Sequence, residues 1–121
     1  TDALGRKIDV VKLAMPNPIY MTEEEVAGLD LFDGEPTRDT VSPLSASYVN
    51  LYIGNKVVVM PAFGGENTEY DLRAKSEVQK VFPDREIIQI YARDILIGGG
   101  NIHCITHQIP SFVRKETPYD K

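Results

Sequence analysis

The segment from Ser47 to Met60 constrains the fold of this 121-residue chain most strongly, because it joins an alternating pattern to a turn signal. Side chains from Ser47 to Ile53 fall on two faces in alternation, as in a β-strand. Gly54-Asn55 favours a tight turn, and Val57 to Met60 is apolar throughout. We predict an antiparallel hairpin whose returning strand is buried on both faces. The first strand would present Ser47, Val49, Leu51 and Ile53 on one face and Tyr48, Asn50 and Tyr52 on the other.

Two short elements are predicted before this hairpin. Ile8 to Leu13 has the composition of a short strand. Thr22 and Glu25 have the spacing of a capping box, and Gly28 limits the helix that follows to about one turn. Gly, Pro, Asp and Thr dominate residues 29–43, which we predict to be a loop.

A longer helix is predicted after the hairpin. Thr68 can cap its start, and Pro83 ends it because the residue before proline avoids helical dihedrals. Its apolar positions recur at helical spacing; they are Ala74, Val78, Val81 and Phe82.

Strand patterns return after this helix. Ile87 to Tyr91 predicts a strand, Ile95 to Ile97 is a short apolar approach to three glycines, and Ile102 to Ile109 alternates with period two. The order strand, hairpin, helix, strand, strand indicates a mixed α/β fold. We expect the tail from Ser111 to Lys121 to be frayed.

Composition excludes several classes of protein. Hydrophobic residues make up 42% of the chain, which is ordinary for one globular domain. The net charge of −5 disfavours a nucleic-acid binder, and no apolar run approaches the roughly 18 residues of a membrane span. A single cysteine, Cys104, allows no internal disulfide. We therefore expect a soluble protein in a reducing, cytoplasmic compartment, with no nucleic-acid or membrane partner.

The string from Gly98 to Cys104 is the least generic part of the sequence. Gly98, Gly99 and Gly100 add no core packing, so they indicate positive φ or something that must approach bare backbone. Exposed backbone amides here could lower the pKa of the Cys104 thiol and make it a nucleophile. The alternative is a tight glycine turn followed by a buried cysteine that acts as a small apolar residue.

Neighbouring histidines do not supply an obvious partner for Cys104. In the predicted strand, His103 and His107 share one face and Cys104 lies on the other. The same alternation argues against a zinc site made by these three residues, which would also lack a fourth ligand. We therefore expect no metal, and a general base would have to come from elsewhere in the fold.

Several motifs together resemble the agmatine deiminases, which belong to the peptidyl-arginine-deiminase-like group of guanidine-modifying enzymes. The string Gly98-Gly99-Gly100-Asn101-Ile102-His103-Cys104-Ile105-Thr106 is similar to their C-terminal catalytic-cysteine motif. Residues 45–53 resemble the family's "SYVNFY" strand, residues 60–64 its "P-x-F-G" turn and residues 82–85 its "FPDR" helix end. The matches follow the family's order over most of residues 9–110. His107 stands where we expect glutamine.

The resemblance implies a fold and an incomplete site. Family members are five-fold pseudosymmetric α/β propellers (penteins), with mixed sheets and helices outside. Residues 1–121 would be the C-terminal portion of one such domain, about two of the five modules. The family's catalytic histidine and guanidinium-binding acidic residues precede the matched region. Those roles are therefore not assigned to Asp9, Asp71, His103 or His107.

The resemblance also implies a reaction. Agmatine deiminases hydrolyse agmatine to N-carbamoylputrescine and ammonia, a step of polyamine (putrescine) biosynthesis, through a covalent thiouronium intermediate and without a cofactor. Cys104 would be the nucleophile, and Gly98, Gly99, Gly100 and Asn101 would line the substrate pocket. The expected partners are a small cationic guanidine, the remaining N-terminal part of the propeller and, as a further possibility, a second copy of the chain. The alternative function is a non-catalytic assembly or binding module with a structural or redox-active cysteine.

Overall fold

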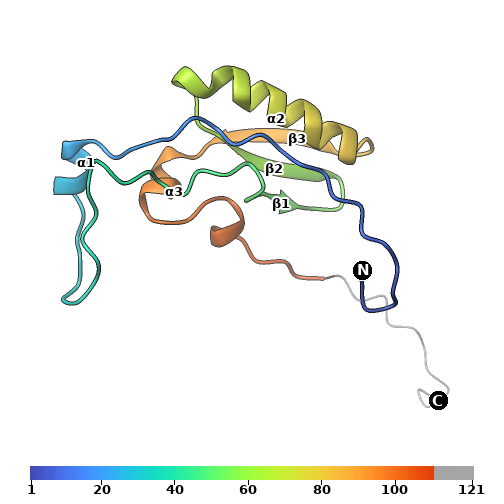
Figure 1. The fold of residues 1–121 in the computed structure, drawn as a ribbon, viewed down its shortest axis with the longest axis horizontal. Helices are drawn as coiled ribbons and strands as arrows, with labels where there is room; N and C mark the ends of the chain where they lie inside the picture. The colour runs from blue at the N-terminus through green and yellow to red at the C-terminus, as the bar shows by residue number, and fades with distance from the viewer. Residues whose placement is uncertain (111–121) are drawn as a thin grey trace, which may run out of the picture.

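A computed structural model describes residues 1–110, which contain one three-stranded sheet with a helix packed on it (Figure 1). Strand β1 (Tyr52–Ile53) pairs antiparallel with β2 (Val57–Ala62), and β2 pairs parallel with β3 (Glu86–Tyr91). Helix α2 (Thr68–Val81) connects β2 to β3 and packs against both. The fold is mixed α/β, as the sequence predicts, with the long helix packed on the sheet. The predicted frayed tail lies outside the described residues.

The hairpin is confirmed, with its turn displaced by one residue. Tyr52 pairs with Val59 and Ile53 with Val58, so the turn is centred on Asn55-Lys56. The Gly54 amide donates to the Val57 carbonyl at 2.8 Å and closes it. Burial of β2 on both faces is confirmed only in part, since no β2 residue is exposed but half of them are only half-buried. Buried β2 side chains are Val58, Met60 and Pro61, whereas Val57, Val59 and Ala62 are half-buried.

The predicted strand over residues 47–53 is wrong except at its last two residues. Residues 48–49 form a turn, and the Asn50 amide donates to the Ser47 carbonyl at 3.4 Å. The reason is a tertiary contact: Tyr48 is buried and its hydroxyl donates to the Asp71 carboxylate at 2.7 Å. Burial raises the pKa of Tyr48, which keeps the phenol protonated as a donor.

The Asp71 carboxylate anchors this part of the core. Besides the Tyr48 hydroxyl, it accepts the amides of Phe63 and Gly64 at 2.8–3.1 Å. The Tyr48 and Phe63 rings lie 5.3 Å apart. One buried anion therefore joins α2, the end of β2 and the turn at residues 47–50. The core around it consists of Ala46, Tyr48, Val58, Met60, Phe63, Ala74, Val78, Ile87 and Leu96.

The predicted single-turn helix is confirmed as α1 (Glu23–Ala27). Thr22 and Glu25 form both hydrogen bonds of the capping box, and the helix ends at Gly28. Arg93 also pairs with Glu25 through two bonds of 2.7 and 2.8 Å. That bidentate contact is the main reason why the pKa of Glu25 is lowered to about 2. It ties α1 to α3 (Arg93–Ile97).

Helix α2 begins and ends close to the predicted positions. Asn67, rather than Thr68, is its N-cap residue, and the Thr68 hydroxyl instead donates to the Gly65 carbonyl at 2.8 Å. Phe82 ends the helix before Pro83, as predicted. At 14 residues it is the longest helix of residues 1–110, and none of these helices is long and apolar enough to cross a membrane.

Two predicted strands, Ile8 to Leu13 and Ile102 to Ile109, are corrected by the described residues. Ile8 to Leu13 forms no strand, because no neighbouring strand pairs with it within residues 1–110, and Val10 is 77% exposed. Ile95 to Ile97 belongs to α3, and Ile102 to Ile109 contains a short 3₁₀ helix (His103–Ile105) where a strand was expected. Period-two alternation yields a strand only when a partner supplies the hydrogen bonds. Residues 29–43 form a loop, as predicted.

Candidate functional site

Cys104 lies in a short 3₁₀ helix that a glycine turn joins to the end of α3. Helix α3 ends at Ile97, Gly98 follows as its C-cap, and Gly99 has a φ of 93°. The chain then enters the 3₁₀ helix His103–Ile105, where the Cys104 amide donates to the Asn101 carbonyl at 3.0 Å. Of the three consecutive glycines, only Gly99 needs positive φ.

The glycines also allow side chains from the same chain to approach the backbone. A Cβ built on Gly100 would lie 2.9 Å from the Cβ of Cys104. A Cβ on Gly99 would overlap the guanidinium of Arg38, whose Nη1 donates to the Ile97 carbonyl at 2.6 Å. Arg38 thus holds the end of α3 from a loop 59 residues earlier in the sequence.

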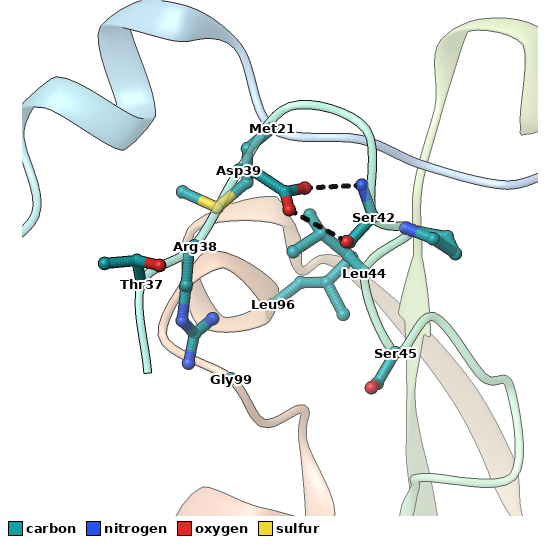
Figure 2. Close-up of a pocket in the computed structure, with 10 residues that line it drawn as sticks. Met21, Thr37, Arg38, Asp39, Ser42, Leu44, Ser45, Leu96 and Gly99 are labelled. Atoms are coloured by element: carbon teal, nitrogen blue, oxygen red, sulfur yellow. Dashed lines mark hydrogen bonds between the residues drawn. The ribbon is translucent and has the colours of Figure 1, made fainter. Parts of the chain in front are cut away.

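Arg38 also borders a cavity that Gly99 helps to line. Figure 2 shows Arg38 extending from its loop toward Gly99, while Asp39 is bound to Ser42. The walls come from three separate segments, which are residues 21, 37–45 and 96–99. The Asp39 carboxylate is bound to Ser42, close to it in the loop. Arg38 is therefore the charged side chain that lines the cavity and also contacts the glycine turn.

The Cys104 thiol is exposed and lies at an open depression. This depression is lined by Asp94, Ile95, Gly98, Gly99, Gly100, Cys104 and Ile105. Within residues 1–110, Cys104 is exposed and is not part of the core. Asn101, the fourth predicted pocket residue, is instead fully buried, and its side-chain oxygen accepts the Ile102 amide at 2.9 Å. Its backbone carbonyl is the part that touches the Cys104 residue.

Hydrogen bonds lower the pKa of the Cys104 thiol. The first cause is the side-chain amide of Asn50, whose Nδ2 lies 3.2 Å from Cys104 Sγ. A backbone hydrogen bond involving Asn101 contributes in the same direction. Both favour the anionic form, which is the reactive form of cysteine.

The side chains of the two histidines and two aspartates that received no catalytic role in the sequence analysis do not line the Cys104 depression. His103, His107 and Asp9 are exposed, and Asp71 is buried in its own network. His103 and Cys104 lie in a 3₁₀ helix and not in the predicted strand. Their side chains still point apart, because successive residues of a 3₁₀ helix are rotated by about 120°. Within residues 1–110, no three His, Cys, Asp or Glu side chains gather where they could hold a metal.

Sequence reasoning missed the roles of two residues, Asn50 and Arg38. Each acts through a contact more than 50 residues away in the chain. Asn50 lies inside the motif at residues 45–53, so its position was singled out while its role was not. No signal in the sequence pointed to Arg38.

Gly99→Ala is expected to lower the free energy of unfolding by about 3 kcal/mol, of which roughly half is left-handed backbone strain. The rest would come from displacing Arg38 from the Ile97 carbonyl. Gly34→Ala is the matched control, since Gly34 has a φ of 94° with open space around it. Urea unfolding of both variants measures the difference. Equal losses would contradict the contact, and the excess at Gly99 should disappear in an Arg38→Ala background.

The sequence is similar to proteins named as agmatine deiminases. The agmatine deiminase of Pseudomonas aeruginosa is 44% identical over 110 residues, which are 91% of this chain and 29% of that protein. A Latilactobacillus sakei relative, provisionally named agmatine deiminase, is 50% identical over 92% of this chain and 30% of its own length. This chain therefore spans only about a third of the length of these relatives.

A solved structure and a family model also match this chain. The agmatine deiminase of Enterococcus faecalis superposes with a TM-score of 0.76 at 38% identity, over 91% of this chain and 29% of that one. Residues 1–110 match the Porphyromonas-type peptidyl-arginine deiminases. Because this match covers 110 of the 121 residues, the chain belongs to the family of Porphyromonas-type peptidyl-arginine deiminases.

Proposed function

We propose that this chain is the C-terminal, nucleophile-bearing portion of an agmatine deiminase. In that protein, residues 1–121 would form about two of the five modules of an α/β propeller. The observation that carries the proposal is the exposed Cys104 thiol, whose pKa is lowered by hydrogen bonds at the edge of a depression floored by glycine backbone. The names of its relatives support the reaction, and their greater length supports the incomplete site.

The proposed reaction begins with attack by the Cys104 thiolate on the guanidinium carbon of agmatine. This carbon is a poor electrophile, because its positive charge is spread over three nitrogens, and thiolate is the strongest side-chain nucleophile. A C–S bond forms, one nitrogen takes up a proton, and ammonia leaves to give a thiouronium adduct. Water then adds to the same carbon and loses one proton. The C–S bond breaks and the remaining O–H proton leaves as the carbonyl forms, which releases N-carbamoylputrescine and restores the thiolate.

Residues near the thiol would contact the substrate mainly through backbone. Gly98, Gly99 and Gly100 line the depression without side chains, so a flat cation can approach their peptide groups closely. Asp94 lines the same depression and adds a negative charge that suits a cationic guanidine. Asn101 would act through its backbone carbonyl, which holds the Cys104 amide.

The proposal also predicts that this chain alone has negligible activity. Proton transfer and the binding of the guanidinium need a histidine and carboxylates, which we place in the remaining part of the propeller. Formation of ureido product from agmatine should be measured for the 121-residue chain alone and after mixing with the preceding segment of the same protein. We expect product only in the mixture. Turnover by the chain alone would contradict the incomplete site, and no turnover by the mixture would contradict the deiminase function.

A further inference from the structure

We propose that Asn50 is a positioning residue for Cys104: its side-chain amide bridges the sulfur and the adjacent backbone, orienting the thiol and donating a hydrogen bond to its anion. Asn50 Nδ2 lies 3.2 Å from Cys104 Sγ, and Asn50 Oδ1 accepts the His103 amide at 2.7 Å. This role rests on the proposed function of Cys104 as nucleophile. It assigns to Asn50 a task that neither Cys104 nor the glycine turn can perform.

The chemistry of the bridge determines which way the amide faces. A backbone N–H can only donate, so the group opposite the His103 amide must be the side-chain oxygen. The other end, Nδ2, then necessarily faces the sulfur as a donor. A donor at this place favours thiolate over thiol, because the anionic sulfur is a much stronger hydrogen-bond acceptor than the neutral one. The direction of the shift in the Cys104 pKa agrees.

Asn50 is held in place by the buried core. Two residues earlier, Tyr48 is 1% exposed and its hydroxyl is bonded to Asp71. The backbone N–H of Asn50 closes a turn by donating to the Ser47 carbonyl. Two residues later, β1 begins at Tyr52 and is paired to β2. The side-chain amide of Asn50 therefore reaches Cys104 from a backbone that is fixed on both sides, as precise positioning requires.

Two charged side chains lie around this turn. The carboxylate of Asp94 lines the same depression as Cys104. The guanidinium of Arg38 lies against Gly99. His103 precedes Cys104 on the same 3₁₀ helix, and its side chain is exposed. Asn50 is the one side chain whose donor reaches the sulfur within residues 1–110.

The test is Asn50→Asp, which keeps the acceptor for the His103 amide and replaces the donor at Cys104 with a carboxylate oxygen. Because Cys104 is the single cysteine of the chain, alkylation by iodoacetamide reports this thiol alone. We expect the apparent thiol pKa to rise by at least about one unit, so that alkylation at pH 7 slows about tenfold. Asn50→Ala should raise the pKa less, because it adds no charge. Circular dichroism checks that each variant is folded.

The control is Asn55→Asp, which adds the same charge at the exposed hairpin turn and should leave the alkylation profile unchanged. An unshifted profile in folded Asn50→Asp, or an equal shift in Asn55→Asp, would overturn the role of Asn50. Turnover of agmatine by the wild-type mixture tests the proposed function separately. A shifted profile without wild-type turnover would reject the deiminase function, whereas turnover with an unshifted profile would reject only the positioning role.

Discussion

Cys104→Ala is expected to reduce ureido product from agmatine by at least about a thousandfold in the assembled enzyme. In the proposed reaction the Cys104 thiolate forms the covalent adduct, and water attacks a delocalised cation slowly without it. Product formation under single-turnover conditions with excess enzyme measures the loss directly. Binding of agmatine should persist, since the depression is built mostly from backbone and other side chains.

A matched variant separates chemistry from folding. Cys104→Ser keeps the size of the side chain and should be nearly as inactive, because an unactivated hydroxyl is a weak nucleophile. In urea unfolding, the free energy of unfolding of both variants should equal that of the wild type to within about 0.5 kcal/mol, since the residue is exposed. Retention of a tenth or more of the wild-type turnover by Cys104→Ser would refute the nucleophile assignment.

Asp71→Ala is expected to lower the free energy of unfolding by about 3–5 kcal/mol, the largest stability effect that we predict for one side chain. The buried carboxylate accepts the Tyr48 hydroxyl and the amides of Phe63 and Gly64. Removing it leaves two buried donors and one half-buried donor without their acceptor. Urea unfolding followed by circular dichroism measures the loss.

Asp71→Asn and Glu69→Gln make this prediction specific. Both remove one negative charge from the first turn of α2, but Glu69 is exposed and has no comparable network. Asp71→Asn places amide hydrogens against donors and should cost about 2 kcal/mol or more, whereas Glu69→Gln should cost less than about 1 kcal/mol. Similar losses in the two amide variants would show that helix charge, not the buried network, explains the effect of Asp71.

Local patterns predicted those elements whose partners lie nearby in the sequence. The β1–β2 hairpin and helix α2 were recognised because alternation, a turn signal, helical spacing and Pro83 act over a few residues. Strand-like composition at Ile8–Leu13 and alternation at Ile102–Ile109 both failed, because no strand of residues 1–110 lies alongside either segment to complete a ladder. Tyr48 departed from its strand pattern because a buried acceptor 23 residues later bound its hydroxyl.

The amino-acid sequence alone determined the mixed α/β class, the family resemblance and the position of the candidate nucleophile, since these depend on short motifs read in order. Only the tertiary structure decided that the Cys104 sulfur is exposed, that Asn50 reaches it and that Arg38 lies against Gly99. The physical reason is distance along the chain. Contacts between residues more than 50 positions apart depend on how the whole core packs, and no local spacing encodes them.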